Sequence, residues 1–369
     1  MEYGTTNIQN LHYGLIHVGL PTMVDIDKDN LPNIIDGNVP KNYELCKEGD
    51  IVFADASEDT NEVAKAVEYY NLNGKKVVCG LHTIHGRDNK NKTVVGYKGY
   101  AFSSMSFHHQ IRRIAQGTKI YSINSKNFSE CYVGIPSKDE QQKIADLLRL
   151  IDERIATQNK IIDKLQSLIK GINQRVFMNS GTNYKLGEIC EIRNGYSGSQ
   201  HLSKKGLKVS RIETISGHKV NMERVGYVAP FESSENYRLQ VGDILFSNIN
   251  SVEYIGNTAF IDKDYDLYHG MNLLRLTPNN MVVIPFYLYL LLNTNRMLNR
   301  FKTVCNKAVS QASINQTELG KTVVQIPDIN AQKQICELYQ ALYDKLESEK
   351  YANSLFQKQK QYLLRQMFI

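Results

Sequence analysis

The chain has 369 residues, of which 42% are apolar and 22% are charged, and its formal net charge is +6. This length predicts about two to four domains with ample buried core, and the composition is ordinary for a soluble globular protein. The longest apolar run, Ile284–Leu292, is too short to span a membrane. The positive charge permits nucleic-acid binding but does not establish it.

The compartment is predicted from the first residues and from the cysteines. Residues Met1 to Gln9 are polar and contain no apolar segment, so no secretory signal peptide is expected. The six cysteines have no paired spacing and are expected to be reduced thiols. They are Cys46, Cys79, Cys131, Cys190, Cys305 and Cys336. We therefore expect a cytoplasmic protein.

The first segment, residues 1–135, is predicted to be a mixed α/β domain. Alternation and β-branched residues predict strands at Asp50–Ala54 and Lys76–Cys79. Helices are predicted at Glu62–Tyr70 and at Tyr100–Ala115.

The polar segment from His85 to Lys92 is too irregular to predict an element. It is either a solvated hairpin loop or a loop that contacts phosphate through Arg87, Lys90 and Lys92. The sequence does not decide between these two interpretations.

Cys79, His82 and His85 are spaced three residues apart and could lie on one helical face as metal ligands. Zinc needs a fourth ligand, and none is local in the sequence. We therefore favour structural or DNA-facing roles for His82 and His85 and assign no metal site.

A long helix is predicted within the second segment, residues 136–179. Pro136 suits a turn before the helix, and Ser137 can cap it with Glu140 as its capping-box partner. Apolar residues follow at alternating spacings of four and three, which is the seam of a coiled coil. The seam is Ile144, Leu148, Ile151, Ile155, Gln158, Ile162, Leu165, Ile169, Ile172 and Val176, with Gln158 as its polar exception.

The third segment, residues 180–326, is predicted to be a second mixed α/β domain. Strands are predicted at Tyr184–Ile189, Asp243–Asn248 and Asn257–Ile261, and a helix at Ile284–Phe301. A basic cluster of Lys204, Lys205 and Lys208 precedes or lies within another strand, and we take these lysines as candidate phosphate contacts.

The fourth segment, residues 327–369, repeats the helix of the second. Ile326-Pro327 follows Ile135-Pro136 by 191 positions, and the same shift transfers the seam. The transferred seam includes Ile335, Tyr339, Leu342, Leu346, Glu349, Asn353, Phe356, Lys360, Leu363 and Met367. A period this long indicates two homologous halves, each with a globular domain and a helix.

Antiparallel pairing of the two helices, with their midpoints level, sets Gln158 beside Glu349 as a polar layer. The same register sets Ile144 near Leu363, Ile151 near Phe356, Leu165 near Leu342 and Ile172 near Ile335. A single polar layer would fix the alignment, because a slip would bury an unpaired polar group. The alternative is that Gln158 and Glu349 lie at the edge of the seam and are exposed to solvent.

Catalytic motifs are not found in the sequence. It contains no P-loop, no dinucleotide fingerprint and no Ser-His-Asp or Cys-His arrangement at a motif spacing. The short aromatic tetrapeptide with which DNA amino-methyltransferases hold a flipped base does not occur either. We therefore expect no catalysis by the chain itself.

Several repeated motifs carry a resemblance to a known family. The junction from Ile135 to Ile144, the motif Gly49-Asp50-Ile51 and its second copy Gly242-Asp243-Ile244 resemble specificity subunits of type I restriction–modification enzymes. So does Tyr184–Ile189, and the resemblance covers essentially the whole chain. Two ordered copies of each junction make it specific.

The resemblance implies two target-recognition domains that each recognise one half of a split double-stranded DNA sequence. It also implies helices that set the spacing and bind two methyltransferase subunits, with restriction subunits joining the complex. S-adenosylmethionine, ATP and Mg²⁺ would be used by those partners, and this chain would bind no cofactor.

Within that resemblance, we expect base contacts from loops that follow the Gly-Asp-Ile strands and from turns before the helices. The first domain offers Ser57 and Lys119. The second offers Asn248, Asn250, Ser310 and Gln311. Amides and hydroxyls suit base recognition, although the same residue types also simply make turns.

The first domain departs from the repeat. The second domain has Tyr184 to Arg193 ahead of the point where the shift places Met1, so the first lacks a counterpart of Lys185-Leu186-Gly187. We interpret this as a downstream start, a truncation or a recombination. The competing functions are a scaffold that holds partners without recognising the first half-site and a self-contained enzyme of unrecognised chemistry.

Overall fold

The computed structural model describes residues 4–177, 181–199, 205–307 and 311–368. They form two compact units, which we treat separately. Unit 1 comprises residues 1–161 and 349–369, and unit 2 comprises residues 162–348. Each unit contains one globular domain and one stretch of each long helix.

Unit 1 contains a mixed four-stranded sheet with the strand order β2-β5-β3-β7. The strands of unit 1 are β1 (Ile8–Leu11), β2 (Met23–Asp25), β3 (Ile51–Ala54), β4 (Ala56–Ser57), β5 (Ala66–Asn71), β6 (Lys76–Cys79), β7 (Thr83–Gly86) and β8 (Tyr121–Ser122). Its short helices are α1 (Tyr13–Val18), α2 (Tyr97–Phe102), α3 (Met105–Ile114) and α4 (Ser125–Phe128). Strand β3 lies in the middle of the sheet, and all of its residues are buried.

Unit 2 contains a four-stranded sheet with the order β10-β16-β13-β15. Its strands are β9 (Thr182–Lys185), β10 (Cys190–Asn194), β11 (Leu207–Val209), β12 (Gly226–Val228), β13 (Ile244–Ser247), β14 (Ile249–Asn250), β15 (Thr258–Phe260), β16 (Leu273–Pro278), β17 (Asn306–Lys307), β18 (Ala312–Ser313) and β19 (Val323–Ile326). Its helices are α6 (Leu186–Ile189), η1 (Ile212–Thr214), η2 (Met222–Arg224), η3 (Ser234–Tyr237), α7 (Pro285–Leu292), α8 (Asn295–Val304) and α9 (Gln316–Gly320). Strand β13 is central and fully buried, as β3 is in unit 1.

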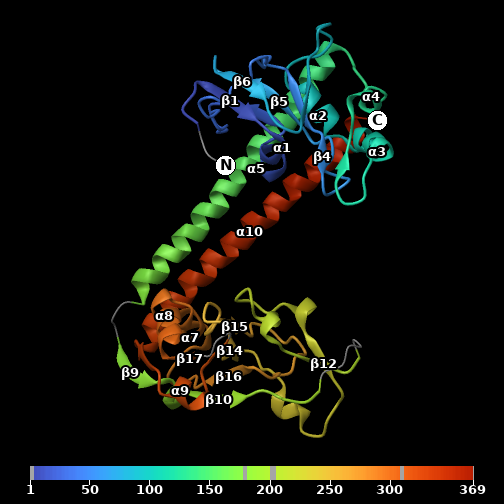
Figure 1. Cartoon of the computed structure of the whole chain (residues 1–369). Helices are drawn as coiled ribbons and strands as arrows, with labels where there is room; N and C mark the ends of the chain where they lie inside the picture. Colours follow the sequence, from blue (N-terminus) through green and yellow to red (C-terminus); the bar gives the residue numbers. More distant parts are fainter. Residues whose placement is uncertain (1–3, 178–180, 200–204, 308–310, 369) are drawn as a thin grey trace. The chain divides into compact units, whose positions relative to one another are not determined.

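The two long helices, α5 (Lys138–Val176) and α10 (Ile329–Met367), lie within the predicted segments 136–179 and 327–369 and are side by side (Figure 1). In unit 1, Asp152 contacts Lys360 and Gln158 contacts Glu349. Residue numbers therefore increase along α5 in the direction in which they decrease along α10. The helices are antiparallel, as predicted. In unit 2 the same sense holds, because Asn173 accepts a hydrogen bond from Tyr339.

The predicted helix at Glu62–Tyr70 is wrong, because Ala66–Asn71 forms strand β5. Charged residues at 62, 65 and 68 give this segment a helix-like period. Ala64 has a left-handed backbone (φ 58°), which ends any helix there. Pairing with β3 then buries Glu68, whose carboxylate forms an ion pair with Lys98 at 3.0 Å.

Two other predicted elements are divided in the structure. The segment Tyr100–Ala115 contributes to α2 and α3, and Ile284–Phe301 contributes to α7 and α8. Tyr184–Ile189 was predicted as a strand with a turn, but only its first residues belong to β9 and the rest forms α6. The side chain of Thr294 caps α8, which explains the new start.

One difference between the units concerns their cores. In unit 2, α6 buries Leu186 and Ile189 against the same core as Phe246 and Leu319, while β10 extends the sheet beyond β16. Among the described residues of unit 1, no strand lies beyond β7 in the corresponding sheet. An open cavity of about 330 Å³ lies against the core there. Its apolar lining includes Ile51, Phe53, Phe102, Phe107, Phe128 and Val133.

Candidate nucleic-acid interface

Each unit carries a small antiparallel sheet directly after its central strand. In unit 1, β4 pairs with β8, so that Ser57 lies opposite Tyr121. In unit 2, β14 pairs with β18, so that Asn250 lies opposite Ala312. The two sheets occupy equivalent places in the sequence repeat. They bring together the segment after the central strand and the segment before the last short helix, which is α4 in unit 1 and α9 in unit 2.

In unit 1 this sheet carries Ser57 and is preceded by Lys119. The Ser57 side chain is half-buried, and its hydroxyl accepts a hydrogen bond from the backbone N–H of Asp59 at 3.1 Å. Lys119 is exposed, two residues before β8 begins. A hydroxyl and an exposed cation are therefore available at one end of this sheet.

In unit 2 the equivalent sheet carries Asn250, with Gln311 immediately before β18. The amide of Asn250 donates to the hydroxyl of Ser247 at 3.1 Å and accepts from the N–H of Ser251 at 2.8 Å. Gln311 is exposed. The Gln311 amide therefore stays available for a bidentate contact, while that of Asn250 is preoriented by its neighbours.

Two further candidates in unit 2 do not join this surface. Asn248 is only 8% exposed, and its side-chain oxygen is buried without a hydrogen-bond partner. It therefore does not lie where a duplex could touch it, and we leave it out of the proposed contacts. Ser310 lies outside the described residues.

A compact loop presents Lys90 and Lys92 to solvent. The carboxylate of Asp88 accepts hydrogen bonds from the backbone N–H groups of Lys90 at 3.0 Å and Thr93 at 2.8 Å. Although burial raises the pKa of Asp88, these bonds and that from the Thr93 hydroxyl outweigh it and lower the pKa to about 2. The ionised carboxylate thus holds the loop that carries both exposed lysines.

Arg87 is not available for phosphate. Its guanidinium pairs with Glu44 and with Asp50, whose Oδ1 lies 2.9 Å from Arg87 Nε. Its side chain is 20% exposed. Burial raises the pKa of Asp50, but the hydrogen bonds from Arg87, Lys47 and His85 prevail, and the pKa lies below its usual value. We therefore remove Arg87 from the candidate phosphate contacts.

The two histidines predicted to face DNA lie in different surroundings. His85 is in β7, and its Nε2 lies 2.9 Å from Asp50 Oδ2. His82 has a left-handed backbone (φ 55°), and its Nδ1 lies 3.4 Å from a carboxylate oxygen of Asp55. Only His82, whose side chain is 52% exposed, is open to a ligand as large as DNA.

The basic cluster of unit 2 is partly outside the described residues, because Lys204 falls there. Lys205 is exposed just before β11. Lys208 lies within β11, and its ammonium is 3.9 Å from the carboxylate of Asp266. Lys205 is therefore the freer of the two described cations.

Sequence reasoning missed a pair of buried glutamines at the start of the long helices. Gln141 accepts a hydrogen bond from Val94 N–H at 3.0 Å and donates to the carbonyls of Lys92 at 3.1 Å and Pro136 at 2.8 Å. Gln332 repeats this arrangement. The signal was present, since the two glutamines are 191 positions apart in the repeated junction.

The helix seam is most polar where Gln158 meets Glu349. Gln158 is only 5% exposed, and its amide donates to the Glu349 carbonyl at 3.2 Å and to the Glu349 carboxylate. Of the apolar seam residues, Leu148, Ile151, Tyr339 and Leu346 are buried. Ile144, Ile155, Leu165, Ile172, Ile335, Leu342, Phe356 and Leu363 are half-buried. Ile144 and Leu363 both pack against one buried cluster that includes Leu148 and Phe368, which agrees with the predicted register.

Comparison with known proteins identifies the family. The profile described as type I restriction modification DNA specificity domain matches residues 29–167 and 180–354. The chain belongs to this family. It carries two specificity regions, one matched in each half of the sequence.

Two named specificity subunits are similar to this chain in sequence. The putative type I restriction enzyme MjaX specificity subunit of Methanocaldococcus jannaschii is 44% identical over 158 residues, which span 42% of this chain and 37% of that protein. The EcoKI specificity subunit of Escherichia coli is 25% identical over 342 residues, spanning 83% of this chain and 71% of that protein.

Solved structures show the same fold. The type I restriction–modification S subunit from M. genitalium superposes with a TM-score of 0.56 at 16% identity, covering 98% of this chain and 88% of that one. A chain from a structure of type I complex assembly and conformational transition gives 0.60 at 16% identity, with coverages of 93% and 89%. Among the described helices, none is both long and apolar enough to cross a membrane.

Proposed function

We propose that this chain recognises a two-part DNA sequence, with one globular domain for each half, and performs no catalysis itself. The observation that carries this proposal is the pair of equivalent small sheets, β4–β8 and β14–β18. Because the duplex backbone has approximate two-fold symmetry, two similar domains can bind two half-sites in similar ways.

Base contacts are assigned to the exposed or half-buried polar side chains of these sheets. Ser57 and Lys119 would recognise the first half-site, and Asn250 and Gln311 the second. Amide groups can form two hydrogen bonds with adenine and so distinguish it from other bases. Phosphate contacts do not distinguish between bases. Lys90, Lys92, Lys205 and Lys208 would contact phosphates.

The long helices are proposed to bind two modification subunits. Leu147 and Leu150 on α5 and Leu338 on α10 are exposed large apolar side chains, and Leu338 is the repeat counterpart of Leu147. An exposed leucine that recurs at one repeat position on both helices suits two copies of one partner. The modification subunits would supply adenine methylation with S-adenosylmethionine, and restriction subunits would supply ATP- and Mg²⁺-dependent cleavage.

The alternative function is a scaffold that binds partners but does not recognise the first half-site. The open apolar cavity beside Phe53 and Phe128 supports this alternative, because unit 2 fills the equivalent region with Leu186 and Ile189. A poorly filled core lowers stability and can loosen the surface above it.

Methylome sequencing tests both functions. The chain is expressed with its modification subunit in a host that lacks other adenine methylation, and methylated sites are mapped. A two-part motif supports recognition by both domains, whereas a motif with one defined half supports the scaffold alternative. Adenine methylation by the chain alone, with S-adenosylmethionine, would contradict the non-catalytic assignment.

Variants then assign the halves. Asn250→Ala with Gln311→Ala should change only the second half of the motif, and Ser57→Ala with Lys119→Ala only the first. Gln340→Ala, on the exposed side of α10, is the matched control and should leave both halves intact. Unchanged preference at both halves in the two double variants would contradict the assigned contacts.

A further inference from the structure

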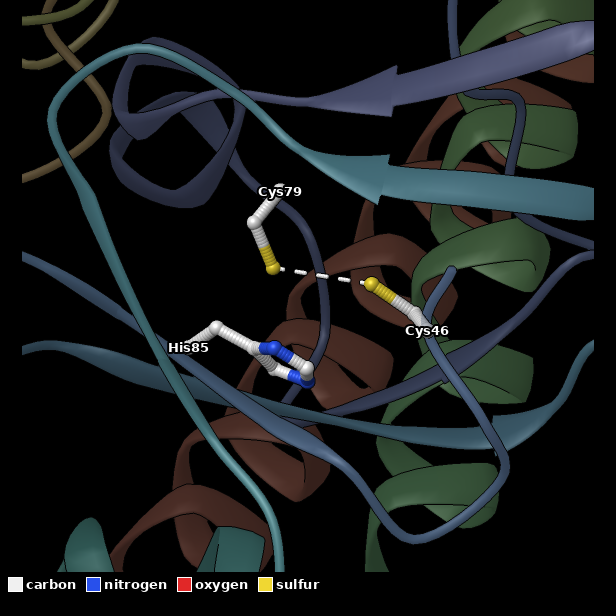
Figure 2. Close-up of side chains that lie close together, drawn as sticks. All are labelled: Cys46, Cys79 and His85. Atoms are coloured by element: carbon white, nitrogen blue, oxygen red, sulfur yellow. Dashed lines mark hydrogen bonds between the residues drawn. The ribbon is translucent and has the colours of Figure 1, made fainter. Parts of the chain in front are cut away.

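Two thiols and an imidazole converge inside unit 1 from three separate segments. Cys46 precedes β3, Cys79 ends β6 and His85 lies in β7. Figure 2 shows the imidazole of His85 beside the two sulfur atoms, which are 3.5 Å apart. One ligand atom from each of the three residues lies within 4.8 Å of the others. This cluster, Cys46–Cys79–His85, takes no part in the proposed DNA contacts.

The cluster has the dimensions of a tetrahedral zinc site. Zinc binds thiolate sulfur at ~2.3 Å and imidazole nitrogen at ~2.0–2.1 Å, which places two sulfurs ~3.8 Å apart and sulfur and nitrogen ~3.6 Å apart. The Cys46–Cys79 separation of 3.5 Å is close to the first of these values. Small side-chain rotations would bring the three ligand atoms onto one ion.

The orientation of His85 suits metal binding. Asp50 is paired with Arg87 and is therefore a carboxylate, which can only accept a hydrogen bond. His85 Nε2, 2.9 Å from Asp50 Oδ2, must then carry the proton, so the lone pair is on Nδ1. A carboxylate that fixes the tautomer of a histidine ligand in this way is a common feature of zinc sites.

The surroundings supply further support. Asp50 is 2% exposed and Cys46 is 6% exposed, so the carboxylate and the thiol are held away from bulk water. Tyr69 is fully buried, and its hydroxyl has no hydrogen-bond partner among the described residues. That hydroxyl lies near the Cys46 sulfur, and a metal-bound thiolate there would accept a hydrogen bond from it.

A fourth ligand is available at the surface side of the cluster. Glu44 Oε2 lies 3.9 Å from His85 Nδ1, and the Glu44 side chain is 62% exposed. Carboxylate oxygen or water completes many zinc sites that have three protein ligands. His82, which the sequence grouped with Cys79 and His85, contacts Asp55 instead. Cys46 is the third member of the cluster in the structure.

The equivalent region of unit 2 provides an internal comparison. Asp243 occupies the position of Asp50, and its carboxylate accepts from Thr277 at 2.6 Å. Arg275 pairs with β13 where His85 pairs with β3, and Leu239 stands at the position of Cys46, three residues before the buried acid's preceding neighbour in each unit. His269 occupies the position of Cys79, so the buried acid belongs to the shared fold, whereas the two thiols are particular to unit 1.

We propose that Cys46, Cys79 and His85 bind one zinc ion, which ties the segment before β3 to strands β6 and β7. The ion would serve as a structural crosslink of the first recognition domain. Zinc is favoured over magnesium or calcium because two of the three donors are sulfur.

The test uses the full chain purified without chelators and without added oxidant. The expected zinc content is ~1 ion per chain, resistant to dialysis and removed by a chelator. Cobalt(II) added to the metal-free protein should give the visible absorption of a tetrahedral sulfur-ligated site. Zinc added to the metal-free protein should raise its Tm, a readout that needs no variant.

Variants locate the site. Cys46→Ser and Cys79→Ser should each lose the zinc, and His85→Gln should keep sulfur ligation but change the cobalt spectrum. Cys131→Ser, which removes another half-buried thiol of unit 1, is the matched control and should retain the ion. Absence of tightly bound zinc with no cobalt band would overturn the proposal. So would a Cys46–Cys79 disulfide in metal-free protein, or equal zinc loss from the control.

Discussion

Gln158 on α5 donates its buried side-chain amide to Glu349 on α10, the residue that stands 191 positions further along the chain. Each is the repeat counterpart of the other. The polar residue of the first seam is therefore matched by a polar residue at the equivalent position of the second. A buried amide paired with a carboxylate favours one alignment of the two helices, because a slip would bury the Gln158 amide away from Glu349.

Replacing Gln158 and Glu349 together by leucine should raise the Tm of the chain, since an apolar pair avoids the desolvation of the polar one. Gln158→Leu alone should destabilise by about 1–3 kcal/mol, because it leaves Glu349 without this partner. With its modification subunits, the double variant should also direct methylation to targets with a gap one base pair longer or shorter. Thermal unfolding and methylation of gap-length libraries measure these effects.

The control for this prediction is a second polar pair on the same helices. Asn353 donates to Asn159 at 2.9 Å, and Asn159 is exposed. Leucine at both of these positions should leave gap tolerance unchanged. Equal gap tolerance in the parent chain and in the Gln158–Glu349 double variant would show that this pair does not set the alignment.

Gln141 and Gln332 should each be important for stability. Gln141→Ala removes the partners of three backbone groups, and orphaned buried groups cost about 1–3 kcal/mol each. Partial access of water should reduce the total to about 2–4 kcal/mol. Urea unfolding followed by circular dichroism measures the loss, and Gln332→Ala should behave alike.

The neighbouring glutamines are suitable controls for these two variants. Gln142 and Gln334 are exposed on the same helix turns. Their replacement by alanine should change the free energy of unfolding by less than about 0.5 kcal/mol. An unaltered urea midpoint in Gln141→Ala would mean that water fully replaces the amide.

Unit 2 should lose stability as the pH falls from about 6.5 to about 4. Burial lowers the pKa of the fully buried His269 from 6.5 to about 4, and Arg275 adds to this, while a hydrogen bond to the Leu273 carbonyl opposes it. The unfolded chain therefore binds a proton at a higher pH than the folded one. The neutral histidine contributes stability that is present above pH 6.5 and lost as the pH approaches 4.

The size of this effect is about 3 kcal/mol across the interval. It is measured by urea unfolding at a series of pH values. His269→Gln should flatten the dependence between pH 6.5 and 4, whereas His218→Gln, at a half-buried histidine of the same unit, should not. Parallel curves for His269→Gln and the parent chain would contradict the prediction.

Phosphate contacts by the loop around Asp88 predict a salt effect. Lys90→Ala with Lys92→Ala should weaken binding to all duplexes alike. The slope of log affinity against log salt should fall by about one for each lysine. Lys41→Ala with Lys75→Ala removes the same charge from exposed positions elsewhere in unit 1 and is the control. If the Lys90/Lys92 variant kept the slope of the parent chain, these lysines would be solvated and would not contact phosphate.

The sequence predicted the long helices well because their signal is local. Heptad spacing and the cap at Ser137 define a helix without reference to the rest of the fold. The helix prediction for residues 62–70 was wrong for the opposite reason. Part of this segment forms strand β5 because it pairs with β3, which comes from another part of the chain. Local periodicity cannot report pairing of this kind.

The candidate site shows the same limit. Ser57 and Asn250 could be selected as candidates because the repeat marks them as equivalent positions in the two halves. Asn248 has the same residue type and a neighbouring position, yet its burial could not be foreseen. The sequence grouped His82 with Cys79 and His85 as possible metal ligands, whereas in the structure Cys46 lies beside Cys79 and His85. The segment that carries Cys46 contacts β6 through backbone hydrogen bonds, which residue spacing cannot predict.

The two junction glutamines have a consequence for how such chains can change over generations. All three partners of Gln141, and all three of Gln332, are backbone atoms rather than side chains. The joint therefore does not depend on which side chains the globular domain carries. A domain of different sequence that presents the same backbone path can be exchanged at this joint, and a new DNA target acquired, while the helices and their binding surfaces stay as they are.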